Sequence, residues 1–95
     1  MSIRFLWDPL KAANNLRKHK VSFKEAVTVF LDSEAINIHD PEHSKSEDRW
    51  VLVGLSNQLR VLVVVHVERE SEVIRIISAR KANKREIQTY IKRRL

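Results

Sequence analysis

The feature that most constrains the fold is a series of three apolar, β-branched runs in the second half of the chain. They cover residues 50–56, 59–67 and 73–79. Asn57-Gln58 separates the first two runs, and the polar segment 68–72 separates the last two. Runs of this length between short polar turns are typical of antiparallel strands. The sequence therefore predicts a three-stranded antiparallel meander.

Three helix starts are marked by capping residues. The signals are Asp8 before Pro9, Ser22 with Glu25, and Asn83 with Glu86. A polar N-cap followed by proline, or by glutamate three residues later, satisfies the free N–H groups of a first helical turn. These signals predict helices from residue 9 to about 19–20, from 22 to about 30, and from 83 onward. The apolar side of the last helix consists of Ile87, Tyr90, Ile91 and Leu95.

The remaining segments complete an α+β order. Residues 3–7 form a short apolar run that predicts a first strand, and residues 35–39 predict a brief strand within the acidic segment 32–48. The predicted order is β-α-α-β-β-β-β-α, within one domain over residues 1–95. We expect a twisted antiparallel sheet with the helices packed on one face.

The register of the meander decides which side chains share a face. If Asn57-Gln58 is a two-residue hairpin loop, Arg49 lies opposite His66, and Arg60 lies on the same face. A two- or four-residue turn after residue 67 adds Arg75 to that face. The other side of the middle strand carries Val61, Val63, Val65 and Val67, and we expect it to form the core. A single β-bulge would change this assignment.

Charge is concentrated at the C-terminal end. The chain has a formal net charge of +6, and residues 80–95 contain seven basic residues and one acidic residue. This pattern indicates a polyanionic partner, although a solvated, charged helix face is an equally reasonable interpretation. The sequence lacks cysteine, a signal-peptide pattern and a long apolar span, so we expect a cytoplasmic protein that does not insert into membranes.

Several ordered blocks of the sequence resemble one known family, the BrnT toxins. They run from the first strand to the last helix: Phe5-Leu-Trp-Asp-Pro, Lys11-Ala-Ala-Asn-Asn-Leu-Arg-Lys-His19, Val21-Ser-Phe-Lys-Glu-Ala26, Val29-Phe-Leu-Asp32, Asp40, His43-Ser44, Glu47-Asp48-Arg49, and Ile74-Arg-Ile-Ile-Ser-Ala-Arg-Lys-Ala82 with Glu86 and Tyr90. Two positions depart from the pattern. Lys20 replaces a usual glycine, and Asn57-Gln58 lacks the usual turn glycine.

The resemblance implies both a fold and a function. It implies a RelE-like fold and a metal-independent endoribonuclease of a type II toxin–antitoxin system, which inhibits translation. It also implies neutralisation by a BrnA-like antitoxin, with operator DNA bound only by the complex of the two proteins. Such an enzyme needs RNA as its substrate and no cofactor.

Cleavage of RNA through its 2′-hydroxyl requires a base, an acid and cations that stabilise the charged phosphorane. Arginine suits the last role because its planar fork pairs with phosphate oxygens. The candidates for that role are Arg49, Arg60, Arg75 and Arg80. For proton transfer the candidates are His43 and Glu47, and Glu47 would need a raised pKa. His66 is more readily interpreted as an ordinary residue of a strand.

Other basic residues are candidates for contact with RNA. They are Lys18, His19, Lys81, Lys84 and Arg85. His39 and His43 are four residues apart, but Pro41 prevents the helix that would align them on a metal, so we predict no metal site. Two alternatives stay open: a non-catalytic basic module that binds nucleic acid, and an interaction protein whose basic surface meets an acidic partner.

Overall fold

A computed structural model describes residues 2–69 and 72–94 of the chain. Met1, Glu70, Ser71 and Leu95 lie outside the described residues. The predicted apolar position at Leu95 and part of the predicted turn over 68–72 therefore lie outside them too. Among the described residues, no helix is long and apolar enough to cross a membrane.

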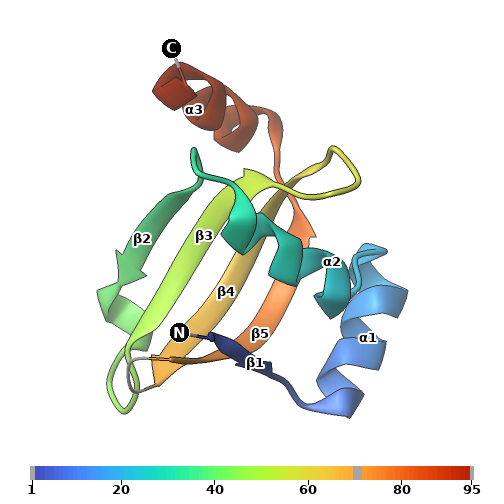
Figure 1. Cartoon of the computed structure of the whole chain (residues 1–95), viewed down its shortest axis with the longest axis vertical. Coiled ribbons are helices and arrows are strands. Elements are labelled where there is room, and N and C mark those ends of the chain that lie inside the picture. The colour runs from blue at the N-terminus through green and yellow to red at the C-terminus, as the bar shows by residue number, and fades with distance from the viewer. Residues whose placement is uncertain (1, 70–71, 95) are drawn as a thin grey trace.

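The structure is a five-stranded sheet with three α-helices and two short 3-10 helices (Figure 1). In chain order the elements are β1 (Arg4–Leu6), α1 (Pro9–His19), α2 (Phe23–Thr28), the 3-10 helix η1 (Val29–Leu31), β2 (Ile36–Asp40), the 3-10 helix η2 (Pro41–His43), β3 (Arg49–Leu55), β4 (Val61–Arg69), β5 (Val73–Lys81) and α3 (Lys84–Arg94). The α+β class, the order of the helices and strands and the antiparallel meander of β3, β4 and β5 are confirmed.

The prediction of a wholly antiparallel sheet is wrong. The strand order is β1-β5-β4-β3-β2, and β1 runs parallel to β5, with Phe5 opposite Ile74. A tight turn forces two strands to be antiparallel, but most of the chain separates β1 from β5, so no local turn constrains their relative direction. The sheet is therefore mixed.

The predicted register between β3 and β4 is also wrong, by one residue. Leu55 lies opposite Val61, and the backbone N–H of Ser56 donates to the carbonyl of Arg60 at 2.8 Å. The hairpin loop thus has three residues, and Leu59 adopts a left-handed φ of 63° to close it. A shift of one residue moves each side chain of a strand to the opposite face relative to its neighbour. Arg49 consequently lies opposite Val67, and Trp50 lies opposite His66.

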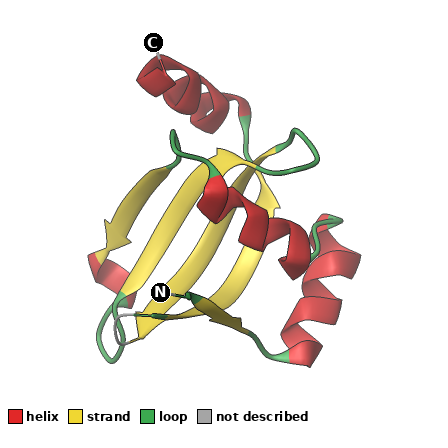
Figure 2. Cartoon of the chain, in the orientation of Figure 1, coloured by secondary structure: helices red, strands yellow, loops and turns green. Residues whose placement is uncertain are grey.

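The helices cover both faces, so the prediction of helices on a single face is wrong as well. The main core packs residues 21, 23, 26 and 29 against the face of the sheet that carries Leu62, Val64 and Ile76. Tyr90 of α3 packs on the opposite face against Val53 and Val63. Figure 2 shows α2 in front of the sheet, α1 beside it, and α3 beyond the upper strand ends. The larger core therefore lies on the leucine side of β4, whereas we predicted it on the valine side.

Candidate active site

Four arginines gather on the sheet face opposite α2. Arg49 on β3 and Arg75 on β5 lie on either side of Val67. Arg69 follows Val67 by two residues on β4, and Arg80 lies opposite Val63. Alternating residues of a strand, and residues directly opposite on neighbouring strands, share one face. We call this surface, defined by Arg49, Arg69, Arg75 and Arg80, the arginine face.

Glu47 lies between two of these arginines and holds both. One carboxylate oxygen accepts hydrogen bonds from Nε and Nη2 of Arg69 at 3.0 and 2.5 Å. The other accepts from Nη2 of Arg75 at 2.5 Å. The hydrogen bond from Arg69, together with the charge of Arg75, holds the pKa of Glu47 below its ordinary value. Glu47 is therefore ionised at neutral pH and fixes the positions of two guanidinium groups.

Arg80 is held in a similar way at the start of α3. Its Nη1 and Nη2 atoms each donate to one oxygen of Glu86 at 2.8 Å, which is the forked geometry that arginine also uses on phosphate. Glu86 in addition accepts the backbone N–H of Asn83, and Asn83 accepts the backbone N–H of Glu86. The hydrogen bond from Arg80 lowers the pKa of Glu86.

Arg49 differs from the other three arginines. Among the described residues its guanidinium has no carboxylate partner and no hydrogen bond. The Nε atoms of Arg49 and Arg75 are both buried without a hydrogen-bond partner in this part of the chain. Unsatisfied buried donors are costly and uncommon in folded proteins. Arg49, which is half-buried and lies across Val67 from Arg75, thus keeps guanidinium donors for a further acceptor.

A loop with a histidine lies at the same end of the sheet. The Nδ1 atom of His43 lies 2.8 Å from Oδ2 of Asp40, and this hydrogen bond lowers the pKa of Asp40. Asp40 is opposite Arg49 in the register of β2 and β3. The hydroxyl of Ser44 donates to the Asp40 carbonyl and accepts the backbone N–H of Arg49 at 2.9 Å. The His43 imidazole, exposed and oriented by a carboxylate, therefore lies beside the arginine face.

The chain is similar to known proteins. The family profile described as "Ribonuclease toxin, BrnT, of type II toxin-antitoxin system" matches residues 7–86.

The chain belongs to the BrnT ribonuclease toxin family.

The crystal structure of the Brucella abortus ribonuclease toxin BrnT is similar to it, with 26% sequence identity and a TM-score of 0.66. The match covers 87% of this chain and 100% of the Brucella chain. A search of curated protein sequences gives no match. Since the profile spans β3, β4 and β5, the arginine face lies within the part of the chain that the BrnT family shares.

Arg60 lies elsewhere in this BrnT-family chain. We expected it to share a face with Arg49 and His66. It does lie on the same side of the sheet as His66, against α2, but the three-residue hairpin loop places Arg49 on the opposite side. The Nε of Arg60 donates to Glu25 at 2.9 Å, its Nη2 donates to the Lys20 carbonyl at 3.1 Å, and the Glu25 side chain is buried. The hydrogen bond from Arg60 lowers the pKa of Glu25. This arrangement is that of a structural ion pair.

His66 is on the buried side of β4. It has no exposed surface, and its ring packs edge-on against Phe30 with a centroid distance of 4.9 Å. Burial lowers the pKa of His66, although Glu68 lies 3.2 Å from its Nε2. The interpretation of His66 as an ordinary strand residue agrees with this position.

The candidate RNA-contacting residues fall into two groups. Lys81, Lys84 and Arg85 follow Arg80 at the upper end of β5 and the first turn of α3. Lys18 and His19 end α1 and line a shallow pocket with Ile77 and Ser78 of β5. Their roles stay predictions. The chain holds no group of three or more potential metal ligands within the residues that the structure describes.

Three members of the site were not predicted: Arg69, Asp40 and Glu86 as the partner of Arg80. Arg69 alternates with Val67, but the predicted strand ended at residue 67, two residues before β4 ends. Extending the predicted alternation would have placed Arg69 on the valine side, and only the observed register, with Arg49 opposite Val67, brings Arg69 to the face of Arg49. The ion pair of Arg80 with Glu86 depends on the geometry of the turn between β5 and α3, which the sequence did not predict.

Proposed function

We propose that this chain is a metal-independent endoribonuclease toxin that cuts RNA on the arginine face. The observation that supports this proposal most strongly is the half-buried Arg49 guanidinium, which lies across Val67 from Arg75 and has neither a carboxylate partner nor a hydrogen-bond acceptor among the described residues. A phosphate with its anionic oxygens supplies such acceptors and receives paired hydrogen bonds from arginine. The proposed setting is the bacterial cytoplasm, where cleavage of RNA inhibits translation.

In the proposed reaction the 2′-oxygen of a ribose attacks the adjacent phosphorus. A base removes the 2′-hydroxyl proton, the bond from phosphorus to the 5′-oxygen breaks, and an acid protonates the departing 5′-oxygen. Arg49 and Arg75 would stabilise the additional negative charge of the phosphorane. His43, oriented by Asp40, is the candidate for proton transfer because an imidazole ring can both accept and donate a proton.

Glu47 and Glu86 fit a positioning role in this proposal. A carboxylate whose pKa is lowered holds no proton at neutral pH and is a weak base, so Glu47 suits orientation of Arg69 and Arg75 better than proton transfer. Glu86 orients Arg80 in the same manner. We propose that Arg80 assists phosphate binding at the upper end of the face, next to Lys81, Lys84 and Arg85.

The proposed chemistry predicts the ends of the products. Purified protein should cleave RNA in the presence of EDTA and leave 2′,3′-cyclic or 3′-phosphate ends with 5′-hydroxyl ends. Every group assigned to the reaction is a side chain that acts without a metal. Products with 5′-phosphate ends, or cleavage only after a divalent ion is added, would contradict the mechanism. RNA binding without cleavage would favour the alternative of a non-catalytic binding module.

Membership of a type II toxin family implies an antitoxin partner. We propose a BrnA-like protein that binds this chain and blocks cleavage at a near-equimolar ratio. We further propose that the complex of both proteins, rather than this chain alone, binds operator DNA. An electrophoretic mobility assay with operator DNA tests this statement, because binding should require both proteins.

A further inference from the structure

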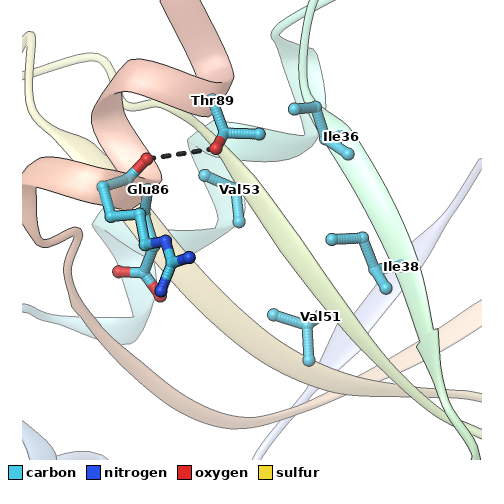
Figure 3. A pocket seen from close by; sticks show the side chains of 7 residues that line it. Ile36, Ile38, Val51, Val53, Glu86 and Thr89 are labelled. Atoms are coloured by element: carbon cyan, nitrogen blue, oxygen red, sulfur yellow. Dashed lines mark hydrogen bonds between the residues drawn. The ribbon is translucent and has the colours of Figure 1, made fainter.

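An apolar pocket lies between α3 and the outer part of the sheet. It has a volume of about 240 Å³ and is lined by Ile36 and Ile38 of β2, Val51 and Val53 of β3, and Arg85, Glu86 and Thr89 of α3 (Figure 3). Ile38 is 51% exposed, which leaves a branched aliphatic side chain open to solvent. Covering such a surface with an apolar side chain of a partner lowers the free energy of the complex.

The strand beside this pocket has an open edge. β2 pairs with β3 over five residues, and no described strand lies on its other side. The opposite edge of the sheet offers less: its edge strand β1 has only three residues, and beyond it the backbone of β5 at Ala79 exchanges hydrogen bonds with the Asn15 amide. Between residues 36 and 40 neither proline nor lysine blocks the addition of a strand. β2 is therefore a template for a further strand.

The helical wall of the pocket carries more positive than negative charge, since its one carboxylate, Glu86, is paired with Arg80. Arg85 lines the pocket, and Lys92 and Arg93 follow Thr89 by three and four residues, which places them on the same side of α3. A partner segment that enters here would meet positive charge on one side and aliphatic side chains below. RNA matches the charge but not an apolar floor without hydrogen-bonding groups. A peptide with aliphatic and acidic residues matches both.

From these features we infer that the antitoxin adds an extended, acidic segment to the free edge of β2 and inserts aliphatic side chains into the pocket under α3. This inference rests on the proposed function, because it assumes that the chain is a toxin with an antitoxin. Main-chain hydrogen bonds to β2 would provide affinity. The pocket would provide specificity, because side chains at every second position of the added strand would enter it. Glu86 lines the pocket and also holds Arg80, so the occupied pocket adjoins the arginine face.

The probe for the test is the neighbouring-gene product that restores growth when it is co-expressed with this chain. Ile38→Asp should weaken its binding at least about tenfold, measured by calorimetry or surface plasmon resonance. Leu10→Asp, a matched change of an aliphatic residue that is 75% exposed on α1, should leave binding unchanged. RNA cleavage by free Ile38→Asp should stay within about twofold of wild type. Equal binding by both variants would overturn the inference.

A second measurement uses the unmodified chain. Hydrogen exchange of the backbone amides of residues 36–40 should slow at alternate positions in the complex, because one set already bonds to β3 and the other faces outward. Unchanged exchange along β2 would exclude strand addition. If no neighbouring protein neutralises the chain, the proposed toxin function fails. If one neutralises it without protecting β2, only the docking inference fails.

Discussion

At the scale of the residue, four arginines share a sheet face but have different partners. Arg69 and Arg75 share Glu47, Arg80 is held by Glu86, and Arg49 has no carboxylate partner among the described residues. Two carboxylates thus orient three cations without neutralising the whole face. An incoming phosphate would meet guanidinium groups whose positions are already fixed, which reduces the reorganisation required during reaction.

Arg60, which forms a structural ion pair, and Arg75, which we propose to bind the phosphate, should differ in their effect on stability. Arg60→Ala should lower the free energy of unfolding by about 2–3 kcal/mol, because it leaves the buried Glu25 carboxylate without its partner. Arg75→Ala should change that free energy by less than about 1 kcal/mol, because its partner Glu47 is partly exposed and keeps Arg69. Chemical denaturation measures both values. A larger loss for Arg75→Ala than for Arg60→Ala would contradict this division.

His66 should make stability depend on pH in mildly acidic solution. Its pKa in the folded chain lies below the ordinary value of 6.5, so below that pH the unfolded chain binds a proton that the folded chain does not. The free energy of unfolding should therefore fall as the pH drops below 6.5, with a slope of at most about 1.4 kcal/mol per pH unit.

The matched variant for this test is His66→Leu, which carries no titratable group. Its free energy of unfolding should depend less on pH between pH 6.5 and 5. Carboxylates with lowered pKa values, such as Glu25, change the free energy of unfolding at more acidic pH. Identical pH profiles for wild type and His66→Leu in denaturation experiments would show that His66 does not cause the dependence.

At the scale of the element, local signals were predictable and distant ones were not. The caps at Asp8 and Ser22 depend on a few neighbouring residues, and both occur as predicted. The direction of β1 depends on a strand at the other end of the chain. The hairpin after β3 differs from the prediction by one residue, and a bulge lies where the pairing passes from Val65 to His66. These two small irregularities decide which side chains share the arginine face.

Gly54 allows β3 to pass close to η1 and the turn before β2. A methyl group there would lie 2.8 Å from Cβ of Ala35 and 2.9 Å from Cγ1 of Val29. Gly54→Ala should therefore lower the free energy of unfolding by about 1–3 kcal/mol. Adding Ala35→Gly should recover part of that loss, as a double-mutant cycle would show. Additive effects of the two substitutions would mean that the close contact carries no strain.

At the scale of the whole molecule, charge is separated along the chain. Basic residues gather on α3 and the arginine face, whereas residues 32–48 contain six acidic residues and one basic residue. A basic surface speeds association with an acidic partner and makes the association sensitive to salt. This distribution was evident from the sequence, but the face on which the arginines meet required the register of the sheet.

Removing the basic charge of α3 should slow capture by the antitoxin. Replacement of Lys84, Arg85, Lys92 and Arg93 with Ser should lower the association rate constant and reduce its dependence on salt concentration. Stopped-flow fluorescence at two salt concentrations measures both effects. If association and inhibition are untouched while RNA binding is lost, the basic helix serves the substrate and the antitoxin docks without it.

The central claim is that the arginine face cleaves RNA. The most direct test is the single-turnover rate of RNA cleavage in EDTA for Arg49→Ala and Arg75→Ala, beside Arg17→Ala as a control on the exposed surface of α1. The two arginine-face variants should remain folded and lose a factor of about 10²–10³ in rate, and the control should match wild type. Rates within a few-fold of wild type for both arginine-face variants would contradict the claim.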